Sequence, residues 1–455
     1  MKRRISALFT DPVYRAMYAL ALPIIVQNLF SAMVNSADVV MLNYVGQSSL
    51  AAVSLAVQYS NIIYMIFYGL GTGASILCAQ YWGKQDTAAI QKILGIALRF
   101  SLGTGLGLFL LAFLIPEPMM RIFTNDEELI RIGIGYLRIV SFSFLFWSMS
   151  EIYLAVLRSM ERVRISTALS VSALLMNIFL NAVFIFGLFG APKMGAAGVA
   201  LATSISRGIQ LVCCLAVSSV SPDVRLKITG IFEKAGVLMQ DFLKLAIPAT
   251  LNDVSWSTAF SMYLVIMGHL STDLVAANSI ISVVRNFGTV LCFAVASAAG
   301  IYVGKTIGSG NMEKAREDGR KSMVITLLAA AAGSLLIAAA SPLILRGVSI
   351  SEAAKGYLRI MLMIHIYYVY GIAVNTTLIC GLYRAGGDSR FGLICDTIDM
   401  WCYAVPLGFI TAFVLKLPPM VVYFLLCTDE FVKWPWVLRH YRSGKWIRNI
   451  TREEV

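Results

Sequence analysis

The chain contains a long internal repeat. A stretch of the first half aligns without gaps on a stretch of the second half, about 225 residues further on, so that Pro23 falls on Pro248 and Gly83 falls on Gly308. Both copies are strongly apolar, and each closes with a polar turn that contains glycine. Many transporters are built from duplicated blocks of hydrophobic helices that handle the substrate between them. Transport is therefore the first hypothesis for this chain.

Composition places both copies in a membrane. Of the 455 residues, 58% are hydrophobic and 14% are charged, whereas a soluble domain carries about 25% charged residues. No soluble core buries this much apolar surface. The net charge of +12 comes from basic residues in short links between apolar runs, which excludes a nucleic-acid-binding protein.

The eight cysteines all lie inside apolar runs, and none has the spacing of a metal site. We therefore expect reduced, buried cysteines that pack as small apolar residues, and no cofactor.

Windows of about 20 apolar residues predict an all-α integral membrane protein with twelve spans. The predicted spans are 15–43, 50–80, 92–115, 132–157, 165–189, 196–219, 240–268, 275–305, 320–345, 357–383, 390–415 and 418–438. Small residues such as Gly103, Gly105 and Gly107 predict close approach of helix backbones.

The longest polar link divides the chain into two six-helix halves. We assign residues 1–225 to the N-terminal half, 226–240 to a cytoplasmic linker and 241–455 to the C-terminal half. Corresponding spans keep the same orientation, which predicts a pseudo-two-fold axis along the membrane normal. Most Lys and Arg residues lie in the links on one side, so both termini are predicted to be cytoplasmic.

Ionisable residues inside spans are functional candidates, because a charge at bilayer depth costs several kcal/mol. Asp38 is the clearest case. The alternative interpretation is that Asp38 lies at the membrane interface, near the outer end of the first span. Asn177 and Asn181 are four residues apart and so share a helix face. Their amide oxygens suit Na⁺, although two asparagines can also simply join neighbouring helices. Glu151 is either a proton or substrate contact or the structural partner of a nearby arginine.

The second half has a different set of polar residues. Asp253 and Arg285 are predicted to pair, which would remove two isolated charges. Asp396 and Asp399 are three residues apart and share a face, so a buried pair would suit proton exchange. Their alternative is a solvated position beside Arg390. His365 is expected to be a hydrogen-bonded core residue.

Aromatic residues within spans include Tyr64 and Tyr68. Most such rings serve packing or anchoring at the membrane interface, but those facing a cavity would offer their faces to organic cations. We take these two tyrosines as candidate substrate contacts.

Several segments resemble the multidrug and toxic compound extrusion family of proton- or sodium-coupled transporters. The likeness covers nearly the whole chain, in the order that the family has. It is carried by Leu22-Pro23 through Asp38 to Gly46, by Gly69-Leu70-Gly71-Thr72-Gly73 through Ala79-Gln80-Tyr81-Trp82-Gly83-Lys84, by Asn177, Asn181 and Phe186-Gly187, and by Gly195 through Thr203.

The resemblance implies a cation or proton site in the N-terminal half, formed by Asp38, Asn177, Asn181 and Thr203. If the coupling ion is Na⁺, the resemblance makes Asp38, Asn177 and Asn181 its ligands; otherwise the ion is H⁺. Some family members carry a glutamate further along the seventh helix, whereas the acid here is Asp253. No second ion site is therefore carried over.

We predict an ion-coupled efflux transporter of a prokaryotic inner membrane, a monomer that exports amphipathic, often cationic, organic compounds by alternating access. Membrane lipids are its other partners, and nucleic acid is not one. The alternative is a lipid-linked saccharide flippase of the same architecture, which several cavity arginines among Arg99, Arg138, Arg207 and Arg285 would favour. No nucleophile and base motif or P-loop is present, so an enzyme is not expected.

Overall fold

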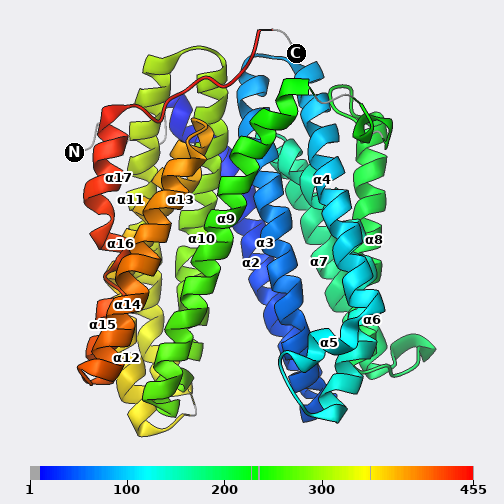
Figure 1. The fold of residues 1–455 in the computed structure, drawn as a ribbon, viewed down its shortest axis with the longest axis vertical. Coiled ribbons are helices and arrows are strands. Elements are labelled where there is room, and N and C mark those ends of the chain that lie inside the picture. The colour runs from blue at the N-terminus through cyan, green and yellow to red at the C-terminus, as the bar shows by residue number, and fades with distance from the viewer. Residues whose placement is uncertain (1–10, 227, 234–235, 349, 454–455) are drawn as a thin grey trace. The chain divides into compact units, whose positions relative to one another are not determined.

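Almost the whole chain is helical in the computed structural model, which describes residues 11–226, 228–233, 236–348 and 350–453. These ranges contain no strand, so the predicted all-α fold is confirmed. Within each half, long helices lie side by side and are joined by short links at their ends (Figure 1).

The first half begins with α2 and continues to the start of α9. Its helices are α2 (Pro12–Asn43), α3 (Gln47–Gly83), α4 (Thr87–Leu114), α5 (Pro116–Arg121), α6 (Glu127–Ser159), α7 (Val163–Phe186), η1 (Leu188–Gly190), α8 (Ala196–Val220) and η2 (Ile228–Ile231).

The second half contains π-helical segments between its α-helices. Its helices are α9 (Gly236–Leu270), α10 (Thr272–Gly308), α11 (Met312–Gly347), α12 (Glu352–Asn375), η3 (Thr376–Tyr383), α13 (Ser389–Thr397), η4 (Ile398–Ala404), α14 (Val405–Phe409), η5 (Ile410–Val414), α15 (Pro419–Leu426), α16 (Asp429–Val432) and α17 (Trp434–Ser443). The segments η3, η4 and η5 are π-helical. Such wider turns occur most often near functional residues.

Ten helical stretches in the described part of the chain are long and apolar enough to cross a membrane, against the twelve spans predicted. The predicted span 240–268 lies in α9, a 35-residue helix that contains many Ser, Thr and other polar residues besides its charged ones. The predicted span 418–438 is divided among the short helices α15, α16 and α17. The two differences thus have separate causes, the polarity of α9 and the short length of α15, α16 and α17.

The repeat is visible in the backbone of two matching turns. The helices α3 and α10 are both 37 residues long, and the positions of their ends differ by the offset of the repeat. After α3, Asp86 caps α4 by accepting a hydrogen bond from the Ala89 amide. At the equivalent position Asn311 caps α11 by accepting from Lys314. The same side-chain cap is thus used in both halves.

The helices form two compact units. The N-terminal unit contains residues 26–250, and the C-terminal unit contains residues 251–452 together with the described residues before Val26. The chain therefore passes from one unit to the other between Ile25 and Val26, within α2, and again between Thr250 and Leu251, within α9. The two crossing points are related by the repeat offset.

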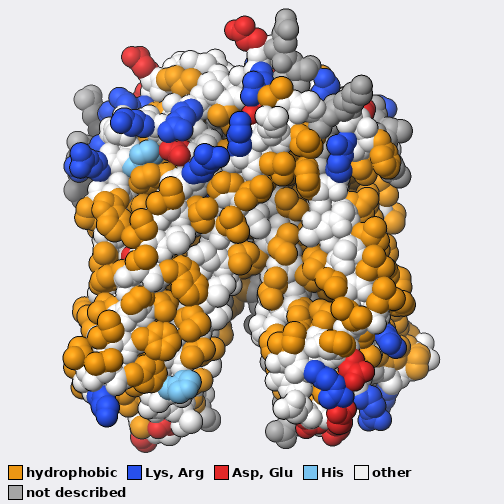
Figure 2. Space-filling view, viewed as in Figure 1, with side chains coloured by type: hydrophobic (Ala, Val, Ile, Leu, Met, Phe, Trp, Pro, Cys, Tyr) orange, Lys and Arg blue, Asp and Glu red, His pale blue; other side chains and the backbone are white. Residues whose placement is uncertain are grey.

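Close helix packing within each unit depends on small residues. A Cβ on Gly105 would lie 2.9 Å from the Ser148 side chain of α6, and a Cβ on Gly333 would lie 2.2 Å from the Gly288 carbonyl oxygen of α10. A Cβ on Gly103 or on Gly107 would meet no described atom within 4 Å. Among the described residues, therefore, Gly105 alone of these three glycines serves close approach. Hydrophobic side chains cover the helix flanks, and Lys and Arg gather near the helix ends (Figure 2).

Candidate functional site

Three of the four residues assigned to the N-terminal ion site meet between α7 and α8. Asn177 donates to the Thr203 hydroxyl at 3.3 Å and to Ser206 at 3.5 Å. Asn181 donates to the Asn177 side-chain oxygen at 3.3 Å. Asp38 belongs to α2, but its side chain lies outside the described part of the structure.

Tyr64 and Tyr68 form the edge of an aromatic group in the same unit. Their rings stack with centroids 5.8 Å apart, and Tyr64 also stacks on Trp147 of α6 at 5.5 Å. The guanidinium of Arg207, on α8, lies 4.2 Å from the centroid of the Trp147 ring. Both tyrosines remain more than a third exposed. The cation over the Trp147 ring is thus supplied by the protein itself.

Glu151 has an arginine partner. Its carboxylate accepts from Arg158 at 3.0 Å, and both side chains are largely buried. This contact supplies the arginine partner of the structural role, and the role as a proton or substrate contact stays a prediction. The two residues are seven apart on α6, which places them two helical turns apart on one face.

The predicted pair of Asp253 and Arg285 is wrong. Asp253 instead pairs with Arg384 at 2.7 Å, and Arg285 lies over the Phe260 ring at 4.9 Å. Arg384 belongs by sequence to a basic link, yet it follows η3 directly and is almost completely buried. Its position in the structure brings a second cation to the acids of the C-terminal half.

The two acids Asp396 and Asp399 meet a buried lysine, not Arg390. Lys433 donates to Asp396 at 3.0 Å, and its amino nitrogen lies 3.5 Å from an Asp399 oxygen. Asp399 is fully buried, and within the described part of the chain neither of its carboxylate oxygens has a hydrogen-bond partner. As predicted, the two acids share one helix face, and both contact the same lysine. Because both side chains are buried, the alternative of a solvated position beside Arg390 is excluded.

Three buried charged residues that follow α15 were not predicted from the sequence: Asp429, Glu430 and Lys433. Glu430 lies 3.2 Å from the Lys433 nitrogen and accepts from Asn375 at 2.6 Å. Asp429 accepts from the hydroxyls of Tyr263 and Tyr368, each at 3.0 Å. The sequence signal that could have identified them is the run of three charged residues within five positions of an otherwise apolar segment.

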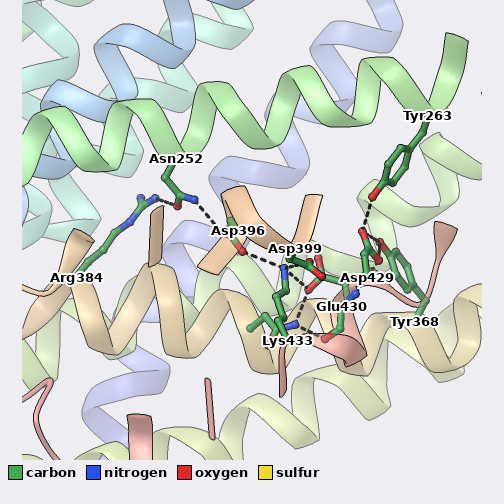
Figure 3. A network of polar contacts seen from close by, with 10 residues as sticks. Asn252, Tyr263, Tyr368, Arg384, Asp396, Asp399, Asp429, Glu430 and Lys433 are labelled. Carbon is green, nitrogen blue, oxygen red and sulfur yellow. Dashed lines mark hydrogen bonds and ion pairs between the residues drawn. The ribbon is translucent and has the colours of Figure 1, made fainter. Parts of the chain in front are cut away.

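These contacts form one connected polar network within the C-terminal unit (Figure 3). Arg384 donates to Asn252 at 2.9 Å, Asn252 donates to Asp396 at 2.8 Å, and Lys433 links Asp396 to the acids beyond it. The network members, in order, are Asp253, Arg384, Asn252, Asp396, Lys433, Asp399, Glu430, Asp429, Tyr263 and Tyr368.

The network contains more acids than bases. Its acids are Asp253, Asp396, Asp399, Asp429 and Glu430, and its bases are Arg384 and Lys433. Full ionisation would leave three uncompensated negative charges in a medium that solvates charge poorly. Binding of protons or cations relieves such an excess. The network is thus suited to taking up and releasing positive charge.

His365 is a core residue, as expected. It is 1% exposed, and its Nδ1 lies 3.0 Å from the Met361 carbonyl oxygen. It lies beside the rings of Tyr368 and Tyr423, so it packs next to the network without joining it.

A model of the MatE family matches the chain twice, over residues 23–183 and 248–410. The starts of the two matches are separated by the offset of the internal repeat. Among curated proteins, the "Uncharacterized transporter YisQ" of Bacillus subtilis is 24% identical over 437 residues, covering 95% of both chains. The "Probable multidrug resistance protein NorM" of Thermotoga maritima is 23% identical over 452 residues, covering 97% of this chain and 96% of the relative.

Solved structures share the fold. A MOP superfamily transporter from Pyrococcus furiosus, described as having a binding pocket of reverse polarity, has a TM-score of 0.85 at 19% identity and covers 96% of this chain and 98% of its own. A multidrug resistance MATE family transporter in an outward-facing conformation has a TM-score of 0.84 at 20% identity and covers 97% of this chain and 98% of its own.

Proposed function

The chain belongs to the MatE family of multi-pass membrane transporters, and we propose that it is a proton-coupled exporter of amphipathic organic compounds. Export proceeds by alternating access, in which ion binding favours one conformational state over the other. A tenfold bias between the two states requires only about 1.4 kcal/mol of differential binding. Neutralising one buried charge is sufficient for that.

The excess of buried acids around Lys433 carries this proposal. Because the network connects Asp253 at one end with Asp429 at the other, a proton taken up at one acid changes the electrostatic energy of all the others. The conformational equilibrium of the C-terminal unit would then depend on how many protons the network holds.

The position of Lys433 favours protons over Na⁺ in this half. Its ammonium group lies within 3.5 Å of carboxylate oxygens of Asp396, Asp399 and Glu430, which is where a monovalent cation would otherwise bind. With this centre already filled by a fixed cation, the remaining negative charge is relieved most simply by protonation.

The N-terminal set is proposed as a second coupling site. The resemblance assigns an ion-binding role to Asp38, Asn177, Asn181 and Thr203, and the hydrogen bonds among the last three support a common function. We propose that both halves take part in coupling, with the acid of the N-terminal site supplied by Asp38.

Efflux of an amphipathic fluorescent dye from proteoliposomes tests the function, with pH and Na⁺ gradients imposed separately. We expect a pH gradient to drive export and a Na⁺ gradient to have no effect. Asp399→Asn and Asp38→Asn should each abolish pH-driven export in folded, inserted protein, while Glu128→Gln, which changes an exposed acid on α6, should not. Export driven by Na⁺ alone would overturn proton coupling, and no gradient-dependent export would overturn the function.

The flippase alternative is not proposed. Of the four arginines that would favour it, Arg99 binds the backbone carbonyls of Ile231 and Glu233, which ties α4 to the segment after α8. Arg207 and Arg285 each lie over an aromatic ring. Each of these three arginines is thus engaged by groups of its own compact unit.

A further inference from the structure

The N-terminal unit contains an arginine that the coupling mechanism does not use. Arg207 lies within a membrane span, is half-buried, and donates only to the neutral side chain of Gln210, at 3.0 Å. No carboxylate among the described side chains forms an ion pair with it. The nearby acid Glu151 is paired with Arg158 and acts on Arg207 only through space. A guanidinium at membrane depth that forms no direct ion pair with a described carboxylate is costly and points to function.

The side of α8 that carries Arg207 is polar. Thr203 lies one turn before Arg207 on the same side of the helix, and Thr203 accepts from Asn177. The exposed residues Ile209 and Val212 lie roughly 140–200° around the helix from Arg207. They line an apolar groove with Phe142 and Phe146. Arg207 therefore points away from the apolar outer side of α8.

Aromatic rings surround the guanidinium on one side. Trp147 holds it by a cation–π contact, and Tyr64 and Tyr68 extend the ring series with their faces partly exposed. The indole nitrogen of Trp147 has no hydrogen-bond acceptor among the described residues. The group formed by Arg207, Trp147, Tyr64 and Tyr68 thus combines aromatic faces for stacking with the N–H donors of Arg207 and Trp147, which have no charged acceptor among the described residues.

We propose that this group binds substrate, with Arg207 contacting a carboxylate and the rings of Tyr64 and Tyr68 stacking on an aromatic part of the same molecule. The inference rests on the proposed export function and specifies its substrate class as aromatic compounds that carry an acidic group. An internal arginine already occupies the cation–π position, so a purely cationic substrate meets like charge there. A carboxylate instead gains charge-assisted, two-pronged hydrogen bonds from the guanidinium.

A matched pair of dyes tests this substrate class. A rhodamine with a free carboxyl group and its methyl ester share one ring system and differ in the acid alone. In proteoliposomes containing the full chain, wild type should export the acid in preference to the ester. Arg207→Gln should lower the acid-to-ester ratio by about tenfold, the loss expected for a charge-assisted contact, and Arg207→Lys should lower it less.

The ratio is independent of the amount of folded protein, because both dyes report on the same molecules. Arg131→Gln, which removes an exposed arginine at the start of α6, should leave the ratio unchanged. Anisotropy of each dye with purified protein in detergent gives a second measurement, in which only the affinity for the acid should depend on Arg207. An unchanged ratio in Arg207→Gln would overturn the acidic-substrate inference while leaving the export function in place; no export of either dye would overturn the export function itself.

Discussion

At the scale of single residues, the fixed charge of Lys433 matters most. Its side chain is 2% exposed and lies within ion-pair distance of Asp396, Asp399 and Glu430. A buried lysine is tolerated only when its charge is compensated, and here the compensation is mutual. Removing the lysine would leave carboxylates facing one another across the vacated space.

Lys433→Met is therefore expected to destabilise the protein by about 3–5 kcal/mol and to abolish export, because it leaves buried charge unpaired. Thermal unfolding in detergent, followed by tryptophan fluorescence, measures the loss of stability. Adding Asp396→Asn to this variant should recover part of it, since one of the unpaired charges is removed as well.

The control is Lys355→Met, which disrupts an exposed pair with Glu352 and should change stability little. A Lys433→Met protein as stable as this control would contradict the role given to the lysine.

At the scale of elements, the matched turns after α3 and α10 differ in one informative residue. Gln85 has a φ of 62° where the second copy has Gly310 with a φ of 84°. Residues other than glycine pay for this left-handed conformation. The first copy of the turn thus carries a cost that the second copy avoids.

Gln85→Gly is expected to raise the stability of the protein by up to about 1 kcal/mol, because it relieves this cost. The reciprocal change, Gly310→Gln, should lower stability by a similar amount. Thermal unfolding of both variants measures the effect. Opposite signs support the equivalence of the two turns, and destabilisation by both changes would contradict it.

The start of α2 is fixed by a charged cap. Asp11 accepts from the Val13 amide at 2.8 Å and pairs with Lys321 of α11 at 2.8 Å. The hydrogen bond from Lys321, followed by the one from Val13, lowers the pKa of Asp11. A carboxyl whose pKa is lower in the folded state stabilises that state above its unfolded pKa, and this stabilisation is lost as pH falls through the folded value.

Asp11→Asn keeps the capping oxygen and removes the charge. We expect it to lower the melting temperature slightly at neutral pH, and the difference from wild type to disappear as pH falls through the lowered pKa of Asp11 in the folded state. Glu317→Gln removes the other, more exposed partner of Lys321 and should have a smaller effect. A difference that grows on acidification would contradict the assigned sign.

At the scale of the whole molecule, sequence predicts the duplication better than the site. Pro23 and Pro248 gave the repeat offset, and the ends of α3 and α10 and the two family matches follow it. This succeeds because turns and prolines act locally on the backbone. The pairing of ionisable residues depends instead on contacts between distant helices, which no local pattern specifies.

Two cases illustrate that difference. Arg384 lies just after the predicted span 357–383, where a solvated link is expected, yet the chain folds it onto Asp253. Lys433 lies with Asp429 and Glu430 inside the predicted span 418–438, but no local pattern shows that these three residues are buried against distant helices. The sharing of one helix face by Asp396 and Asp399 was predictable because it depends on spacing alone.

The passage of α2 and α9 from one compact unit to the other means that neither half of the sequence is self-contained. A fragment ending before α9 would carry residues 12–25, which belong to the other unit, and would lack residues 236–250 of its own. An unduplicated ancestor would thus have folded as an intertwined pair, each copy lending the start of its opening helix to its twin. Fusing two such copies into one chain would make the association of the two copies intramolecular, after which the two halves could diverge in charge.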